Sequence, residues 1–293
     1  MGALIGGAFR AAVWCCSLLS LGGQRRLARW LGWAAWRLNT TDARVTRTNV
    51  ALCFPELSAA EADALARRSL QNTAALLTES GVVFHWRRER WLPLVRRVQG
   101  EFLIRDAIRS GAGVLLLAPH LGNWEFLSLY LGRYRFLALY DPPRQRALEA
   151  PILRSRRRSG ARFQPIAAAG IRSLYGVLRR HGVAALLPDQ VPERQAGVYA
   201  RFFGHPALTM TFAHRLIRAT RPRVLLCAAL RTPGGFDVRI VEAETGVYDP
   251  DPAVSARAMN AGIEALVRAD PAQYQWEYKR FKRQPPGHPG VYR

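Results

Sequence analysis

From residue 111 onward, short apolar runs alternate with longer segments whose apolar residues recur at helical spacing. We predict strands at residues 113–118, 135–140, 161–166, 183–188, 223–230 and 236–243. We predict helices at residues 123–132, 145–158, 170–181, 208–220 and 253–269. Such alternation is typical of an α/β fold, with a mainly parallel or mixed central sheet flanked by helices.

The preceding segment, residues 41–110, has the spacing of helices. Ser58 and Glu61 form a capping-box sequence, and apolar residues then recur every three or four positions as far as Gly81. We see no internal repeat and no low-complexity linker. The predicted organisation is therefore a single domain over residues 39–283, with a helical part at 39–110, an α/β core at 111–283 and a loosely ordered tail at 284–293.

The N-terminal residues 1–38 are expected to associate with a membrane. Residues 2–21 have about the length of a span but contain Arg10 and several glycines. Trp30, Trp33 and Trp36 then recur every third position among arginines, a composition that suits the lipid headgroup layer. The segment is predicted to be a membrane anchor or a pair of interfacial helices, the alternative being an amphipathic helix packed on the domain itself.

The charge of the chain is strongly positive, at +22 with only 21 acidic residues. Lys279 and Lys282 are the only lysines, so arginine carries nearly all of this charge. Arginine forks suit phosphates, anionic lipid or an acidic protein partner, although codon bias also enriches arginine. The four cysteines, at positions 15, 16, 53 and 227, have neither metal-ligand nor disulfide spacing, which favours a reduced body facing the cytoplasm.

His120 and Glu125 follow the apolar run at 113–118 and are the strongest candidates for catalysis. A histidine can take a proton from an alcohol as the alcohol attacks a carbonyl, and a carboxylate on its other ring nitrogen would orient it. Asp189 follows the strand predicted at 183–188 and belongs to the same expected site floor. No nucleophile motif is present, which favours direct acyl transfer to a hydroxyl. The sequence provides no metal-ligand cluster, so no metal and no cofactor are expected.

Five segments, occurring in order, resemble the bacterial lipid A biosynthesis (late) acyltransferase family, which is related to glycerolipid acyltransferases with a His-x4-Asp/Glu motif. The segment His120-Leu-Gly-Asn-Trp-Glu125 resembles that motif. The other matching segments begin at Asn49, Pro188, Arg201 and Gln273, and together they cover roughly residues 40–283.

The resemblance implies an O-acyltransferase at the cytoplasmic face of the bacterial inner membrane. It implies an acyl–acyl carrier protein co-substrate and a phosphorylated glycolipid acceptor, and we expect a monomer. His120 would be the general base and Glu125 its partner. The residues expected to bind substrate or support the site are Asn123, Trp124, Asp189, Gln190 and an arginine of the 154–158 cluster, for which spacing favours Arg158, then Arg157.

Three other interpretations remain open at the level of sequence. The same chemistry could act on an ornithine-type lipid, a glycerolipid, another glycolipid or a specialised metabolite. A hydrolase would use water in place of the acceptor. A basic membrane-surface or nucleic-acid-binding protein would also explain the charge, but no nucleic-acid module is recognisable and we expect no nucleic-acid partner. Phe202, Phe203 and Trp124 are expected to line an apolar channel for the acyl chain.

Overall fold

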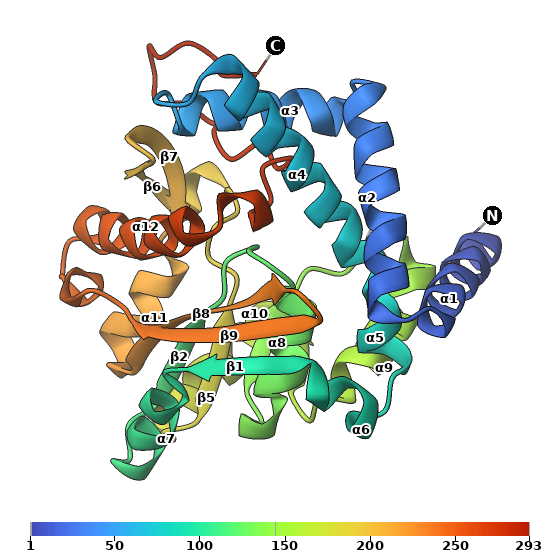
Figure 1. Cartoon of the computed structure of the whole chain (residues 1–293). Helices are drawn as coiled ribbons and strands as arrows, with labels where there is room; N and C mark the ends of the chain where they lie inside the picture. The colour runs from blue at the N-terminus through green and yellow to red at the C-terminus, as the bar shows by residue number, and fades with distance from the viewer. Residues whose placement is uncertain (1, 144, 293) are drawn as a thin grey trace.

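The computed structural model describes residues 2–143 and 145–292, apart from the side chains of residues 2–5. Its centre is a seven-stranded sheet with the order β1-β9-β8-β2-β5-β3-β4 (Figure 1). Strands β8, β2, β5, β3 and β4 are parallel, whereas β9 is antiparallel to β8 and β1 is parallel to β9. The strands are β1 (Val95–Gln99), β2 (Val114–Leu117), β3 (Leu137–Tyr140), β4 (Arg162–Pro165), β5 (Val183–Leu186), β8 (Arg223–Thr232) and β9 (Gly235–Glu242), with a separate hairpin of β6 (Gly197–Phe202) and β7 (His205–Met210).

Helices flank both faces of the sheet, as predicted. They are α1 (Gly2–Leu18), α2 (Leu21–Arg37), α3 (Thr41–Cys53), α4 (Ala59–Thr78), α5 (Ser80–His85), α6 (Arg88–Trp91), α7 (Glu101–Arg109), α8 (Trp124–Leu131), α9 (Glu149–Arg157), α10 (Ala168–Arg179), α11 (Phe212–Thr220) and α12 (Pro252–Ala269). The capping box predicted at the start of α4 is confirmed: the Ser58 hydroxyl accepts from the Glu61 amide, and the Glu61 carboxylate accepts from the Ser58 amide.

Two apolar cores lie on the two faces of the sheet, and the pleat of β2 divides its side chains between them. Leu115 and Leu117 pack into the core that α10, α11 and α12 cover. Val114 and Leu116 pack into the core that α7 and α8 cover. All four are fully buried. A parallel strand covered on both faces has no polar side, which is why the sequence of β2 reads as a continuous apolar run.

All six strands predicted after residue 111 are confirmed, but the helix predicted at 208–220 is wrong at its start. Residues 205–210 form β7, and the helix begins only at Phe212. The hairpin of β6 and β7 was not predicted. It closes through a turn at Phe203 and Gly204, whose φ angles are 48° and 79°. Helix α12 fixes the position of the hairpin, because Asn260 of α12 donates to the Arg201 carbonyl and the Thr209 hydroxyl.

The part predicted to be helical, residues 39–110, also contains a strand that the sequence analysis missed. Residues 95–99 form β1, at the edge of the sheet beside β9. Arg96 and Arg97 in the middle of this strand are exposed. Charged side chains suit an edge strand, because they discourage pairing with another chain, but they remove the apolar run that would reveal the strand in the sequence.

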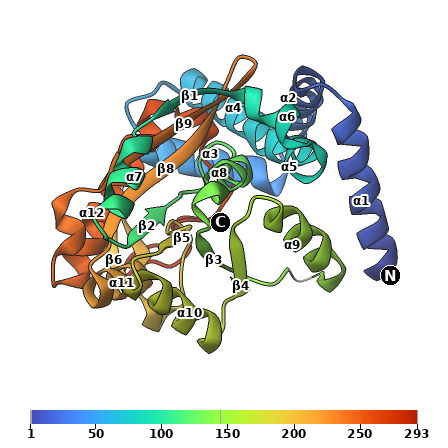
Figure 2. The ribbon, with the colours of Figure 1, turned by 90° about the horizontal axis from the view of Figure 1, so that it is seen from below.

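The two N-terminal helices pack against the rest of the domain. Gly32 lets α2 approach α4 closely, since a Cβ atom there would lie 2.4 Å from the Cα atom of Gln71. Helix α1 lies at the outside of the molecule, on the same side as α9 (Figure 2). Along residues 2–143 and 145–292, we find no helix with the combined length and apolar character that crossing a bilayer requires. Trp30 and Trp33 on α2 are 62% and 44% exposed.

The C-terminal tail, expected to be loosely ordered, has no helix or strand from residue 284 to residue 292. Its last described residue nevertheless contacts the helical part of the domain. The Tyr292 hydroxyl donates to Asn49 Oδ1 at 2.6 Å and accepts from the Phe281 amide at 3.0 Å.

A buried carboxylate, Glu79, joins the helical part to the sheet. Its side chain is fully buried and accepts from Arg25 Nε of α2 and Arg231 Nε of β8, each at 2.8 Å. It also accepts from Asn123 Nδ2 at 2.9 Å. Arg25 continues the network by donating to the carbonyls of Thr232 and Gly235 in the turn between β8 and β9. Removal of the Glu79 charge would leave one buried and one partly buried guanidinium group uncompensated.

We expect Glu79→Gln to lower the free energy of unfolding by about 3–5 kcal/mol, the usual cost of breaking a buried ion pair. Glu242→Gln is the control, because Glu242 pairs with Arg223 at the surface and such pairs contribute less than about 1 kcal/mol. Denaturant titration measures both. Equal effects of the two substitutions would contradict the structural role given to Glu79.

Candidate active site

The register of two parallel strands brings His120 and Asp189 together. Leu117 of β2 pairs with Leu186 of β5, and the two site residues each lie three positions beyond that pair. The amide of Ala118 donates to the Leu186 carbonyl at 2.8 Å, which keeps the two chains side by side past the ends of the strands. The carboxyl ends of parallel strands meet at one edge of a sheet, where ligands bind in open α/β folds.

The Asp189 carboxylate holds His120 through two contacts. Its Oδ2 accepts from the His120 backbone amide, and its Oδ1 lies 2.8 Å from the ring Nδ1, each contact being 2.8 Å long. Burial alone would raise the pKa of Asp189, but the charge of the His120 ring and these hydrogen bonds outweigh it, so the pKa of the carboxyl is lowered. An ionised carboxylate only accepts, so Nδ1 donates to Asp189, and in the neutral form of the ring the lone pair is on Nε2.

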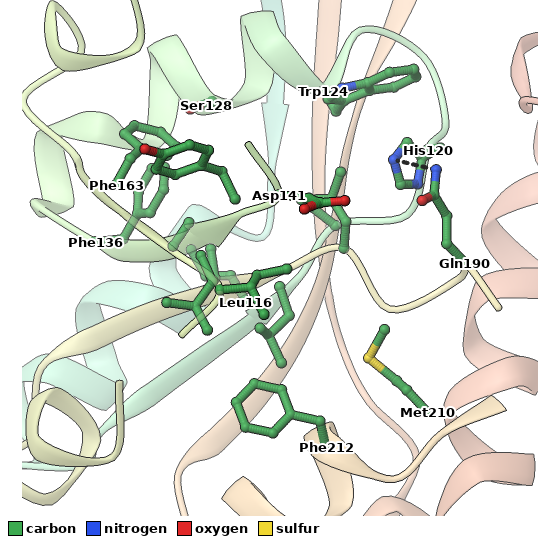
Figure 3. A pocket seen from close by; sticks show the side chains of 18 of the residues that line it. Leu116, His120, Trp124, Ser128, Phe136, Asp141, Phe163, Gln190, Met210 and Phe212 are labelled. Carbon is green, nitrogen blue, oxygen red and sulfur yellow. Dashed lines mark hydrogen bonds between the residues drawn. The ribbon is translucent and has the colours of Figure 1, made fainter. Parts of the chain in front are cut away.

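The Nε2 side of the ring borders the side chains of Gln190 and Trp124. Gln190 Nε2 lies 3.3 Å from His120 Nε2 (Figure 3). The Trp124 indole meets the His120 ring edge to face, with ring centroids 4.8 Å apart. The structure therefore brings Asp189, Gln190 and Trp124 together around His120, while their roles toward substrate stay a prediction.

The loop from His120 to Asn123 is fixed by backbone contacts with distant segments. The Gly122 amide donates to the Gln273 carbonyl at 2.9 Å, and the Gln275 amide donates to the His120 carbonyl at 3.1 Å. Gly122 has a φ of +66°, and a Cβ atom there would lie 2.1 Å from the Ala229 carbonyl oxygen. Asn123 caps α8, since its side chain accepts from the Phe126 amide at 2.8 Å.

The structure corrects the expectation that Glu125 faces His120 as its hydrogen-bonding partner. Asp189 occupies that place, and Glu125 pairs with Arg156 of α9. Arg156 Nε lies 3.1 and 3.2 Å from the two carboxylate oxygens, and its Nη2 also donates to Glu125. Burial would lower the pKa of Arg156, but the carboxylate of Glu125 raises it overall. Both side chains are about one fifth exposed, at 23% for Arg156 and 20% for Glu125, and they line the same cavity as His120.

The arginine of the 154–158 cluster that enters the site is Arg156, rather than the Arg158 or Arg157 that sequence spacing favoured. Arg158 donates to the backbone carbonyls of Phe84 and Trp86, and Arg157 is exposed. The rotation of α9 follows from packing, because the buried Ser155 hydroxyl donates to the Val83 carbonyl. Residue spacing within an arginine run contains no information about that contact.

A cavity of about 530 Å³ extends from His120 into the domain. Its polar lining residues include His120, Gln190, Glu125 and Arg156, and its remaining lining is mainly apolar. Figure 3 shows Phe136 and Phe163 well away from the imidazole, on the other side of the space. The residues of the apolar lining include Leu116, Leu127, Leu131, Phe136, Ala138 and Phe163.

The structure contradicts the expectation that Phe202 and Phe203 line this channel. Both rings are buried in the core beside the hairpin of β6 and β7, where Phe203 packs against Trp276 with centroids 5.5 Å apart. Trp124 does line the cavity. Cys227 also lines it, but burial raises the pKa of its thiol to about 12, so the thiol stays protonated. Within residues 2–143 and 145–292, no cluster of three or more His, Cys, Asp or Glu side chains could hold a metal ion.

Comparison with known proteins identifies the family of the chain. Residues 8–283 match the model of the bacterial lipid A biosynthesis acyltransferase family. The chain belongs to this family. It is 26% identical to the lipid A biosynthesis lauroyltransferase of Escherichia coli K12 over 279 residues, which cover 91% of this chain and 88% of that protein. It is also 26% identical to the palmitoleoyltransferase of the same strain over 254 residues, covering 85% and 81%. A lipid A biosynthesis acyltransferase of Haemophilus influenzae is 25% identical over 276 residues, covering 89% and 85%.

As a member of the acyltransferase family, the protein is an enzyme. The structure also shows contacts between segments that resemble the family but lie far apart in the sequence. Asn49 of α3 donates to the Trp276 and Tyr278 carbonyls at 2.6 and 2.9 Å, which fixes the C-terminal segment that in turn fixes the His120 loop. The sequence analysis did not identify Glu79, Arg156 or Arg231 individually. Buried charged residues leave no periodic pattern, so only their contacts reveal them.

We expect Gly122→Ala to lower the free energy of unfolding by about 3 kcal/mol, because overpacking adds to the strain of a positive φ angle. Gly111→Ala is the control: Gly111 has a φ of +71°, but a Cβ atom there would meet nothing within 4 Å, so only the backbone cost of about 1 kcal/mol applies. Chemical denaturation distinguishes them, and equal losses would show that the close approach to Ala229 is unimportant.

The pairing of Glu125 with Arg156 predicts non-additive kinetics. Glu125→Gln and Arg156→Gln should each lower acyl-transfer activity at least about 10-fold, and the double variant should be little worse than either alone, because residues in contact are energetically coupled. The measurement is a double-mutant cycle on kcat/KM. If Glu125 acted on His120 instead, Arg156→Gln would have little effect and the two losses would multiply.

Proposed function

We propose that the protein transfers a fatty acyl chain from an acyl–acyl carrier protein thioester to a hydroxyl of a lipid A precursor. The observation that carries the proposal is the His120 imidazole, which Asp189 holds through Nδ1 and which presents Nε2 to a largely apolar cavity. A general base at the polar end of an apolar cavity suits a reaction that joins a fatty acyl group to an alcohol.

In this proposal the acceptor hydroxyl is itself the nucleophile. It takes the place of Gln190 beside Nε2, gives its proton to that nitrogen and attacks the thioester carbonyl carbon. The tetrahedral intermediate then collapses, its C–S bond breaks, and the carrier leaves as a thiolate that takes the proton from Nε2. The ionised Asp189 stabilises the imidazolium formed between the two steps. The two ring nitrogens of His120 contact the side chains of Asp189 and Gln190. Among the described residues, no serine or cysteine forms a hydrogen bond with the ring, so the proposal assigns no protein nucleophile.

The remaining cavity residues have supporting roles in the proposal. The apolar lining between Leu116 and Phe163 receives the acyl chain, at about 0.8 kcal/mol for each buried methylene. Glu125 holds Arg156 in the wall of the cavity near Phe163, where the guanidinium can hydrogen-bond with a polar group of the bound substrate. In this proposal the enzyme acts as a monomer, and the reaction calls for no cofactor beyond the carrier-bound donor.

We further propose that the enzyme works at the cytoplasmic face of the inner membrane. The exposed indoles of Trp30 and Trp33, among the arginines of α2, suit the headgroup layer of an anionic membrane. The charge of +22 would also attract acyl carrier protein, which is acidic. Docking on the surface through α2 requires no membrane-spanning helix.

The test is mass spectrometry of lipid A from a bacterial host that lacks its own late acyltransferases. Wild-type protein should add the mass of one acyl chain, and His120→Ala should abolish the addition, because general-base catalysis contributes at least about 100-fold. Immunoblotting of membranes controls for protein level, and circular dichroism controls for folding. Unchanged lipid A in cells that contain the wild-type protein would reject this acceptor. Full activity of a folded His120→Ala variant would reject the mechanism.

A further inference from the structure

A second charged pocket lies on the other side of the His120 loop. It has a volume of about 290 Å³ and lies between α2, α4 and the turn that joins β8 to β9. Four arginines line it: Arg25 and Arg29 from α2, Arg68 from α4 and Arg231 from β8. We call it the arginine pocket. In Figure 1 the turn between β8 and β9 points toward α4 and α2.

The positive charge of the arginine pocket is largely uncompensated. Glu79 pairs with Arg25 and Arg231 through their Nε atoms, so one carboxylate serves two guanidinium groups. Arg29 and Arg68 are exposed and form no ion pair with any described residue. Four cations around one small pocket repel one another unless an anion joins them.

Arg231 provides a second, independent indication of a ligand. Its side chain is only 7% exposed, and its Nη1 and Nη2 atoms are buried with no hydrogen-bond acceptor among residues 2–143 and 145–292. Burial outweighs the neighbouring carboxylate and lowers the pKa of Arg231. Buried donors without acceptors cost free energy, whereas a phosphate offers several oxygens to a guanidinium fork.

The arginine pocket is connected to the candidate active site through shared residues. Asn72 borders both this pocket and a cavity of about 10 Å³ whose lining includes Gly122 and Trp124. Trp124 in turn lines the cavity that contains His120. A ligand that occupied both pockets would therefore extend past the loop between Gly122 and Trp124.

The position of α2 favours a ligand that arrives from a lipid surface. Arg25, Arg29 and Trp33 follow one another at intervals of four residues, so they share one side of the helix. Trp33, one turn beyond Arg29, and Trp30, which directly follows Arg29, are both exposed. If these indoles lie in the headgroup layer, the arginine pocket lies at the depth of lipid phosphates.

We propose that the arginine pocket binds a phosphate group of the acceptor glycolipid, which places the acceptor hydroxyl at His120 on the other side of the loop. The inference rests on the proposed function and adds to it the residues that recognise the acceptor. Arg29 and Arg68 approach the phosphate from the exposed side, and Arg231 from the buried side. Phosphate recognition would then govern acceptor affinity rather than the chemical step.

The experiment measures steady-state transfer from acyl–acyl carrier protein in neutral detergent micelles. The acceptors are a phosphorylated lipid A precursor and the same precursor after phosphatase treatment. We expect Arg29→Gln combined with Arg68→Gln to raise KM for the phosphorylated acceptor at least about 10-fold, as the loss of charge-assisted hydrogen bonds predicts. The kcat, and the KM for the dephosphorylated acceptor, should stay within about two-fold of wild type.

Arg26→Gln combined with Arg67→Gln is the matched control. Both residues are exposed arginines on the same two helices, but neither lines the pocket, so this variant should behave as wild type with both acceptors. Equal changes in KM for both acceptors, or none, would overturn the phosphate site. Transfer to neither acceptor by the wild-type enzyme would instead reject the proposed function, and the inference with it.

Vesicles distinguish the acceptor phosphate from a phospholipid headgroup. In flotation with phosphatidylglycerol vesicles, the Arg29/Arg68 variant should lose no more binding than the Arg26/Arg67 control, since both lack two surface charges. A selective loss of vesicle binding with unchanged KM values would assign the pocket to a membrane phospholipid, contrary to the proposal.

Discussion

The fold depends on the buried carboxylate of Glu79, because three separate parts of the chain donate to it. Arg25 comes from α2, Arg231 from the end of β8, and Asn123 from the residue that caps α8. Asn123 also ends the loop that carries His120. A single ionised group in a low-dielectric interior therefore fixes the helical part relative to the sheet and the candidate active site relative to both.

The candidate active site combines two carboxylates with different partners. Asp189 is almost fully buried and orients His120, whereas Glu125 is partly exposed and holds Arg156. The first pair can accept and release a proton, and the second presents a cation in the wall of the same cavity. Asp189, rather than Glu125, contacts His120 because the parallel register of β2 and β5 brings Asp189 beside His120.

Two charged clusters lie on opposite sides of the loop from Gly122 to Trp124. In the proposal, one receives the reacting hydroxyl of the acceptor and the other its phosphate. The His120 side has a base and an apolar cavity, and the arginine pocket has uncompensated cations. The loop itself has little freedom to move, because its backbone bonds to Gln273 and to Ala229 of β8. A rigid loop between two binding regions sets a fixed distance between a recognised phosphate and the reacting hydroxyl.

The sequence alone determined the α/β class, six of the eight strands after residue 111, the capping box at Ser58 and the family to which the chain belongs. These features are local, because apolar periodicity and short motifs are visible along the chain even when the contacts between distant residues are unknown. The tertiary structure alone decided that Asp189 contacts His120, that Arg156 pairs with Glu125, and that residues 95–99 join the sheet. Strand register, helix rotation and the pairing of buried charges arise from contacts between residues far apart in the chain, and no spacing along the sequence encodes them.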